Sequence, residues 1–298
     1  MVTHVDMDTL FTGGTGLSGT RIVGELLGTH PAFVLIPIET RFISLGGGLC
    51  DLANERVTFE QFEERFLGEW YPSIGRRGID HYVDRPTVDA ALARLRDGHR
   101  GLPFTSARQF AHAILDPIAE AAGVHGWVET TPGNAHRARS LERMFPSMRL
   151  VHTYRDGRDV ASGVVSLDWG PNDLAAGLDW WADGIGRAFG AVARVVDGRA
   201  MNLQMEDLVA RNRDAAYRRL VDSLGLSDAL ETRAFFDERM TEADVHIGRW
   251  RADVAPHDLA EFEAHHERLA AALVDDGYPY VPVTPSEALA PAPAASTH

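Results

Sequence analysis

The chain has 298 residues, of which 45% are hydrophobic and 24% are charged, a composition typical of a folded globular protein with a sizeable core. Its formal net charge of -14 argues against a nucleic-acid or anionic-membrane partner, because binding a polyanion needs a contiguous basic face. A single cysteine, Cys50, excludes an intramolecular disulfide and a cysteine-based metal site.

All 29 basic residues are arginine, so every mechanism that needs a lysine is excluded, including a Schiff base and the lysine of a GxxxxGK[ST] nucleotide loop. No apolar stretch approaches the roughly 20 residues that cross a bilayer. The N-terminal segment MVTHVDMDTL lacks the pattern of a secretory signal. These features predict a cytoplasmic protein without a membrane partner.

The first elements are a short buried strand around Leu10, a glycine-rich turn, and a helix over residues 21–28 with apolar side chains at helical spacing. A His-Pro pair ends this helix, and residues 32–39 form a second apolar run that predicts the next strand. We expect Glu39 at the carboxyl end of that strand, which is the edge where ligands bind in parallel α/β sheets.

Residues 49–122 are helical in pattern, acidic and arginine-rich, and they predict a helical insertion. The later apolar runs predict three further strands, at 126–129, 148–154 and 200–205. Further helices are expected at 134–145, 158–167 and 174–196, and then to about residue 275.

This alternation of strands and helices predicts an α/β fold, a mostly parallel central sheet with helices on both faces. We expect a single domain over residues 1–283 that includes the insertion. Residues 284–298 are rich in Ala and Pro without an apolar period, and predict a disordered tail. The chemistry should lie in the loops that follow the strands.

The glycine-rich turn, TGGTGLSGTR, allows the backbone to fold tightly and to point successive N–H groups at an anion, beside the positive end of the following helix. Ser18 and Thr20 offer hydroxyl donors, and Arg21 offers a planar guanidinium. The alternative is a plain turn that connects strand to helix. A nucleotide kinase or ATPase is disfavoured, because Thr20 and Arg21 stand where Lys-Ser/Thr belongs.

The second motif is VHTYRDGRDVAS over residues 151–162, a strand that ends in Arg155 and leads to a helix with Ser162. Together with the glycine loop it predicts an anion site with two ends, because both motifs follow strands of one sheet. The alternative is that the arginines pair with Asp156 and Asp159 on a solvated turn, where ion pairs contribute little.

These two motifs, together with IETRF (38–42) and GRWR (248–251), resemble in order and spacing the sulfotransferases that use 3′-phosphoadenosine 5′-phosphosulfate (PAPS). The resemblance covers roughly residues 8–281, and IETRF is similar to a segment of tyrosylprotein sulfotransferases and their bacterial relatives. It implies a P-loop-like sulfotransferase fold. It also implies sulfuryl transfer from PAPS to a hydroxyl or phenol of a small-molecule acceptor, with no metal.

By this resemblance, the glycine loop would hold the 5′-phosphosulfate, Arg155 would bind the 3′-phosphate, and Arg249 or Arg251 would close over that phosphate. Glu39 would be the catalytic base, and Arg41 would hold the acceptor or neutralise the site. The alternative for this last pair is a structural ion pair. The cofactor-binding residues implied are Gly16, Leu17, Ser18, Gly19, Thr20, Arg21, Arg155, Ser162, Arg249 and Arg251.

Three positions depart from the family pattern. Leu17 stands where the loop usually has a basic residue, Thr130 where many relatives have lysine, and Gly163 where a serine is usual, with Ser162 one residue early. We expect Arg21 to replace the cation missing at Leu17. The departures leave open a sulfotransferase fold with another donor or chemistry, and a protein that binds an anionic nucleotide without turnover.

Overall fold

The structure, a computed structural model, describes residues 9–73 and 78–283. The predicted tail over 284–298 lies outside these described residues, as do residues 1–8 and 74–77.

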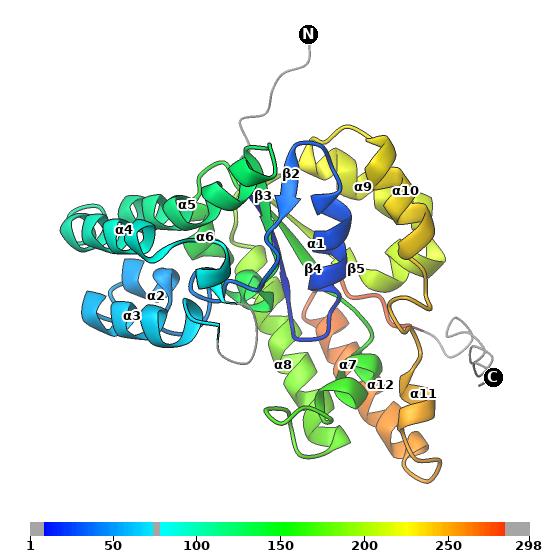
Figure 1. Cartoon of the computed structure of the whole chain (residues 1–298). Coiled ribbons are helices and arrows are strands. Elements are labelled where there is room, and N and C mark those ends of the chain that lie inside the picture. Colours follow the sequence, from blue (N-terminus) through cyan, green and yellow to red (C-terminus); the bar gives the residue numbers. More distant parts are fainter. Residues whose placement is uncertain (1–8, 74–77, 284–298) are drawn as a thin grey trace, which may run out of the picture.

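Five strands form one parallel sheet in the order β2-β3-β1-β4-β5 (Figure 1). They are β1 (Thr9–Gly14), β2 (Phe33–Leu35), β3 (Gly126–Glu129), β4 (Arg149–Tyr154) and β5 (Ala200–Gln204). Every residue of β1 and β3 is buried, as expected of strands covered on both faces. The α/β fold with a mostly parallel central sheet is confirmed.

The second strand is shorter than the predicted run over 32–39. Its pairing with β3 ends where Ile36 N–H donates to the carbonyl of Val128 at 2.9 Å. Pro37 follows and has no N–H to continue the ladder. Glu39 therefore lies in an irregular segment beyond the strand and not at its last residue.

The chain leaves the neighbouring strands β1 and β4 toward opposite flanks of the sheet, from β1 to β2 and from β4 to β5. The register pairs Gly14 with Thr153, so the loops after both strands begin at the same edge. Such a switch point is where open α/β sheets bind ligands.

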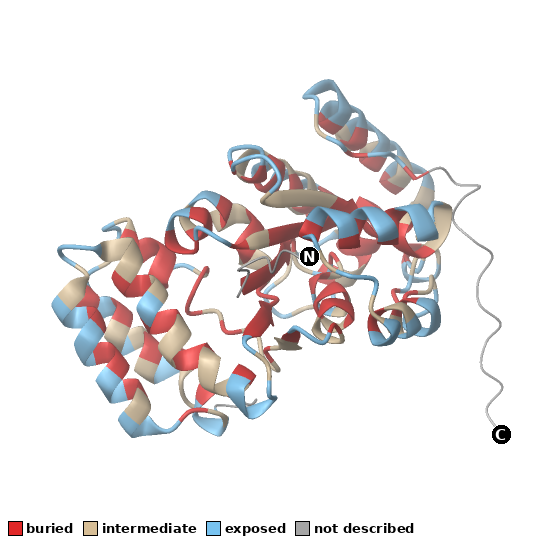
Figure 2. Ribbon diagram, turned by 90° about the horizontal axis from the view of Figure 1, so that it is seen from above, coloured by how far each residue is buried: buried red, intermediate tan, exposed pale blue. Residues whose placement is uncertain are grey.

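Two hydrophobic clusters cover the two faces of the sheet, and successive residues of β1 alternate between them: Leu10 belongs to one and Phe11 to the other. One face carries α1 (Thr20–Gly28), α9 (Arg213–Leu224) and α10 (Leu230–Arg239). The other carries α5 (Pro103–Ala121), α6 (Ala138–Met144) and α8 (Leu174–Val192). Figure 2 shows the buried strands between these helices.

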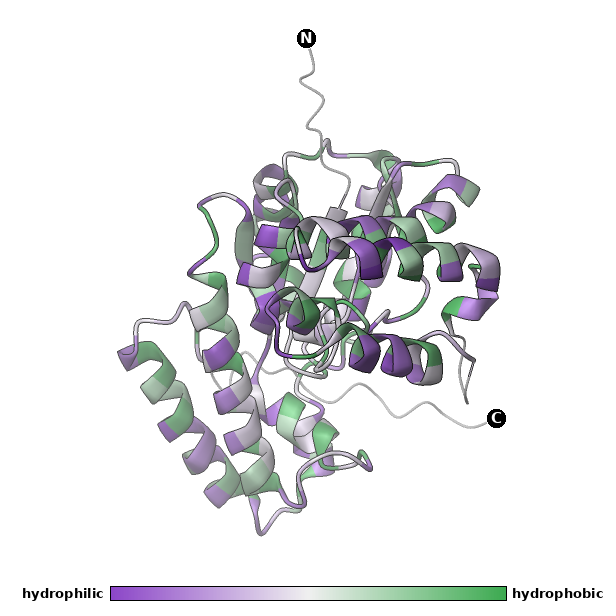
Figure 3. Ribbon diagram, turned by 90° about the vertical axis from the view of Figure 1, so that its left-hand side faces the viewer, coloured by the Kyte–Doolittle hydropathy of each residue, from purple (hydrophilic) through white to green (hydrophobic). Residues whose placement is uncertain are grey.

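Helices predominate in residues 49–73 and 78–121, between β2 and β3, in agreement with the predicted helical insertion. They are α2 (Leu49–Ala53), α3 (Phe59–Arg65), a π-helical turn η1 (Phe66–Trp70), a 3-10 turn η2 (Ile79–His81), α4 (Arg85–Gly98) and α5. At their centre the rings of Phe42, Phe62, Phe66 and Phe110 pack edge-to-face. Figure 3 shows hydrophobic and hydrophilic residues interleaved along these helices, as expected where one side faces a core.

The remaining helices lie near the carboxyl edge of β4 or follow the strand ends. They are η3 (Pro132–Arg137), α7 (Gly157–Val164), η4 (Asp207–Arg211), α11 (Trp250–Asp253) and α12 (Leu259–Asp275). α12 packs on α8 and α7, and α11 packs on α7. In the described part of the chain, no helix has the length and apolar character needed to cross a membrane.

Candidate active site

The glycine loop connects β1 to α1 and has the form of an anion cradle. A Cβ on Gly14 would collide with the carbonyl oxygen of Thr153, and Gly19 has φ 88°, so both positions favour glycine. Within the described residues, the N–H groups of Gly16, Leu17 and Gly19 donate no hydrogen bond. These N–H groups and the positive end of α1 suit an anion.

Of the two hydroxyls predicted to bind the anion, that of Ser18 holds the loop in shape. Ser18 is buried, and its Oγ donates to the carbonyl of Thr15 at 2.7 Å and lies 3.4 Å from Thr153 Oγ1. Thr20 is buried in the first turn of α1, and its carbonyl accepts from Thr12 Oγ1 at 2.9 Å. The contact between Ser18 and Thr153 joins the glycine loop to the end of β4.

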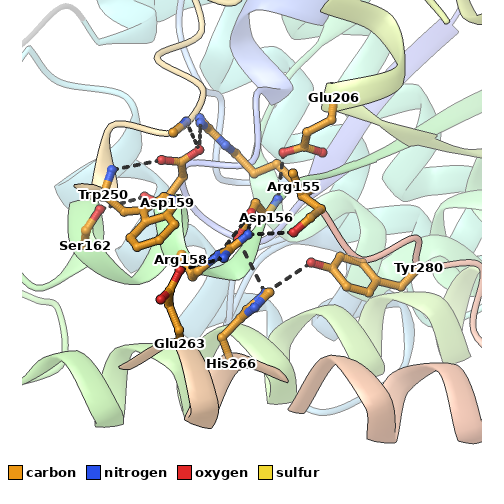
Figure 4. Close-up of polar contacts among 12 residues, drawn as sticks. Arg155, Asp156, Arg158, Asp159, Ser162, Glu206, Trp250, Glu263, His266 and Tyr280 are labelled. Carbon is orange, nitrogen blue, oxygen red and sulfur yellow. Dashed lines mark hydrogen bonds and ion pairs between the residues drawn. The ribbon is translucent and has the colours of Figure 1, made fainter. Parts of the chain in front are cut away.

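Arg155, directly after β4, is buried, and one of its nitrogens lacks a hydrogen-bond acceptor. Its Nη2 donates to Asp159 Oδ2 at 2.9 Å and to the carbonyl of His246 at 3.1 Å (Figure 4). Its Nε is buried and makes no hydrogen bond within the described chain. A buried cationic donor without an acceptor is costly, so this nitrogen suits an oxygen of an anionic ligand.

Asp159 connects Arg155 to the C-terminal segment. Its carboxylate also accepts from the backbone N–H groups of Gly248 at 2.8 Å and Trp250 at 3.2 Å. Burial raises the pKa of this carboxyl group. The GRWR segment therefore reaches the second motif through its backbone.

The side chains of GRWR and Ser162 have other neighbours. Arg249 is exposed and pairs with Asp253 at 3.0 Å, and the Arg251 guanidinium lies 4.4 Å from the centre of the Trp250 ring. Ser162 Oγ lies 3.4 Å from the carbonyl of Asp159, to which it donates within its own helix. Their predicted contacts with a 3′-phosphate stay predictions.

Two of the departures from the family pattern lie in contact. Leu17 has φ 62°, and a Cβ built on Gly163 would be 2.8 Å from Leu17 Cδ1. The leucine therefore occupies space that a serine at 163 would need. Thr130, the third departure, is fully buried and its Cγ2 fills the space beside Gly24 of α1.

Glu39 and Arg41 line a hollow of about 380 Å³ together with Arg21. Arg41 Nε lies 3.8 Å from Glu39 Oε2, and both side chains are about one-third exposed. Arg21 Nε pairs with Glu25 at 2.9 Å, and its Nη1 lies 3.5 Å from the carbonyl oxygen of Pro37. The full lining is Arg21, Pro37, Ile38, Glu39, Thr40, Arg41, Glu69, Trp70, Pro72 and Gly78.

Glu129, at the end of β3, is a residue that the sequence reading missed. Its fully buried Oε1 accepts from the N–H and Oγ1 of Thr40, at 3.2 and 3.1 Å, and from the N–H and Oγ1 of Thr131, at 3.0 and 2.6 Å. Asn134 donates to its Oε2 at 2.6 Å. The carboxylate thus ties the segment with Glu39 to β3, and the signal in the sequence was its place at the last residue of a predicted strand.

Positive backbone φ angles also gather in this region. In the described chain four non-glycine residues have them, and Leu17 (φ 62°), Arg41 (φ 60°) and His246 (φ 56°) all belong to the segments described above. This conformation is unfavourable for L residues and persists where the surrounding structure enforces it, often at functional sites.

Comparison with known proteins shows the family to which the chain belongs. A family model described as the sulfotransferase family matches residues 9–229, about three-quarters of the chain. The chain belongs to the sulfotransferase family. The family supports sulfuryl transfer as the general reaction.

Solved sulfotransferases have a similar fold. The sulfotransferase domain of the Synechococcus PCC 7002 olefin synthase aligns with a TM-score of 0.51 at 16% identity, covering 90% of this chain and 94% of that one. Sulfotransferase STF1 from Mycobacterium tuberculosis H37Rv aligns at 0.49 and 16% identity, covering 90% and 78%. Among curated proteins, none matches the chain.

A buried polar network supports the second motif of this sulfotransferase (Figure 4). Arg158 Nη2 pairs with Asp156 Oδ2 at 2.6 Å, and its guanidinium lies 4.5 Å from the centre of the Trp250 ring. His266 Nε2 lies 3.4 Å from Asp156 Oδ1 and 3.3 Å from the hydroxyl of Tyr280. Both arginines therefore form buried ion pairs, Arg155 with Asp159 and Arg158 with Asp156. The alternative that these residues pair on a solvated turn is wrong.

Glu206, after β5, completes this network. Its Oε1 accepts from the N–H of Asp156 at 2.8 Å, and its Oε2 is buried without a hydrogen bond in the described structure. Burial raises the pKa of Glu206 to about 7. Among the described residues, no group of three or more His, Cys, Asp or Glu side chains could hold a metal ion.

Proposed function

We propose that this sulfotransferase takes its sulfuryl group from PAPS and transfers it to a hydroxyl or phenol of a small molecule. The observation that carries the proposal is the buried Arg155 Nε, which has no hydrogen-bond acceptor in the described chain. The glycine loop adds backbone N–H groups that donate no hydrogen bond within the described residues. The two motifs touch through Ser18 and Thr153, so one ligand with two anionic ends fits both.

The donor set fits the two ends of PAPS. The N–H groups of the loop from Gly16 to Gly19 would hold the 5′-phosphosulfate, and Arg155 would hold the 3′-phosphate. When bound, PAPS supplies the sulfuryl group: a sulfur–oxygen bond forms to the acceptor as the one to the nucleotide phosphate breaks, and its electron pair stays on that phosphate. Arg21 supplies the positive charge that Leu17 does not.

Glu39 takes the proton of the acceptor hydroxyl in this proposal. Its carboxylate faces a hollow that could admit a small molecule, and Glu129 anchors the adjacent Thr40. Arg41 holds Glu39 by their ion pair and balances its charge. Because charge spreads over the transferred group, positioning and charge stabilisation by Arg21, Arg41 and the loop N–H groups supply most of the catalysis.

The second candidate is a sulfotransferase-fold protein that binds the nucleotide without turnover or uses another donor. The contact between Leu17 and Gly163 favours it, because an apolar side chain fills the place of two polar residues of the family pattern. Thr130 also favours this candidate, because a fully buried threonine stands where many relatives have a lysine.

Calorimetry with 3′-phosphoadenosine 5′-phosphate (PAP), the product nucleotide, tests donor binding. We expect the wild type to bind PAP, and Arg155→Ala to bind it at least about 10-fold more weakly, because a charge-assisted hydrogen bond contributes about 1.5–3 kcal/mol. The matched control is Arg218→Ala, an exposed arginine on α9. Absence of PAP binding by the wild type, or equal binding by Arg155→Ala, would contradict the proposal.

A further inference from the structure

Two tryptophans lie beside the glycine loop without a role in the donor site. Trp169 follows α7, and 64% of its surface is exposed. Trp180 belongs to α8 and is partly buried. Their ring centres are 6.2 Å apart and the planes are tilted by 54°, so the two indoles form one aromatic surface.

This surface adjoins the loop at one residue. A Cβ built on Gly16 would be 3.3 Å from Cη2 of both Trp169 and Trp180, so both indole edges converge on the same glycine. The neighbouring Trp181 points elsewhere: it is fully buried against Gly157 and Tyr280. On α8, the Trp181 indole therefore packs in the core and the Trp180 indole packs beside the loop.

An exposed indole beside the glycine loop is a candidate ligand-binding surface. Trp169 is one of few large hydrophobic side chains exposed in the described chain, and it lies where the transferred group would be bound. Trp180 contacts the Trp169 indole at a tilt, and the exposed remainder of that indole forms a platform. An indole platform favours a second flat aromatic ring by stacking.

We propose that the acceptor carries a planar aromatic ring that stacks on Trp169, with Trp180 behind it, and presents a phenolic hydroxyl toward the glycine loop. This rests on the proposed function, which supplies the reason for an acceptor at the loop. Asp168, an exposed carboxylate next to Trp169 in the chain, disfavours an anionic acceptor. The acceptor class is therefore a neutral phenol.

Binding of a matched pair of probes tests the platform. 2-Naphthol and trans-decahydro-2-naphthol share a hydroxyl and a carbon skeleton, but only the first has a flat π face. We titrate each into the full-length protein by calorimetry, with and without PAP. The wild type should bind 2-naphthol about 2- to 10-fold more tightly than the saturated alcohol, the ratio that one aromatic pair provides.

Variants of Trp169 separate stacking from other effects. Trp169→Ala should remove most of the preference for 2-naphthol, and Trp169→Phe should keep it, while both bind PAP as the wild type does. Leu230→Ala, at a more exposed hydrophobic residue on α10, is the control and should change nothing. Because the side chain is exposed, these variants should fold.

The outcomes distinguish the platform from the donor site. An equal affinity of the wild type for both probes, or an unchanged preference in Trp169→Ala, would overturn the platform even if PAP binds normally. A wild type that fails to bind PAP but keeps a preference for 2-naphthol lost in Trp169→Ala would overturn the proposed function and leave an aromatic binding site standing.

Discussion

Glu206→Gln should change how the stability of the protein depends on pH. Burial raises the pKa of Glu206 to about 7 from an ordinary value of 4.5. The folded protein therefore keeps a proton that the unfolded chain releases, and this group's contribution to stability is greatest below pH 4.5 and falls as the pH rises to 7. The loss amounts to about 3 kcal/mol above pH 7.

Glutamine removes this titration and keeps the local hydrogen bond. Its side-chain carbonyl can still accept from the N–H of Asp156, which Glu206 Oε1 accepts now at 2.8 Å. Any fixed cost of the amide is the same at every pH. We therefore compare the difference in unfolding free energy between variant and wild type at two pH values, and expect it to shift in favour of Glu206→Gln by about 2–3 kcal/mol from pH 5 to pH 8.

Chemical denaturation followed by tryptophan fluorescence measures this difference. The control is Glu64→Gln, an exposed carboxylate on α3, which should show no comparable shift between the two pH values. A constant difference for Glu206→Gln as well would refute the reasoning, because it would mean that Glu206 is already ionised in the folded protein at pH 5.

The remaining predictions concern the unusual loop residues. Arg21→Ala should weaken PAP binding and slow turnover about 5-fold, because Arg21 replaces the cation missing at Leu17; unchanged calorimetry and rates would remove that role. Gly163→Ser forces Leu17 Cδ1, 2.8 Å from the new Cβ, to move. A double-mutant cycle of PAP binding tests this contact. Gly163→Ser should weaken PAP binding by about 0.5–1 kcal/mol less in the Leu17→Ala background than in the wild type. Additive effects of the two substitutions would contradict the contact.

Local patterns in the sequence predicted the sheet well. Apolar runs ending in polar loops marked all five strands, and the glycine loop and Arg155 were found because each directly follows one of them. The prediction made the second strand too long, because the apolar residues continue past Pro37. The missing N–H of that proline ends the hydrogen-bond ladder. Periodicity reports burial and does not report where pairing stops.

Contacts between distant segments could not be predicted. Leu17 and Gly163 are separate departures in the sequence, and only the packing of α7 beside the loop shows that Gly163 leaves the space that Leu17 occupies. The crosswise pairing of Arg155 with Asp159 depends on the helical turn that separates them and on burial by the segment around Trp250. Such contacts arise from tertiary packing, which one sequence does not encode locally.

Transfer of labelled sulfur from PAPS to a panel of phenols and alcohols, by the wild type and by Glu39→Gln, tests the proposed function most directly. We predict a sulfated phenol with the wild type, a rate at least about 100-fold lower with Glu39→Gln, and a normal rate with the exposed control Glu64→Gln. No sulfated product from any acceptor, or a Glu39→Gln rate equal to that of the wild type, would contradict catalysis by Glu39 at this site.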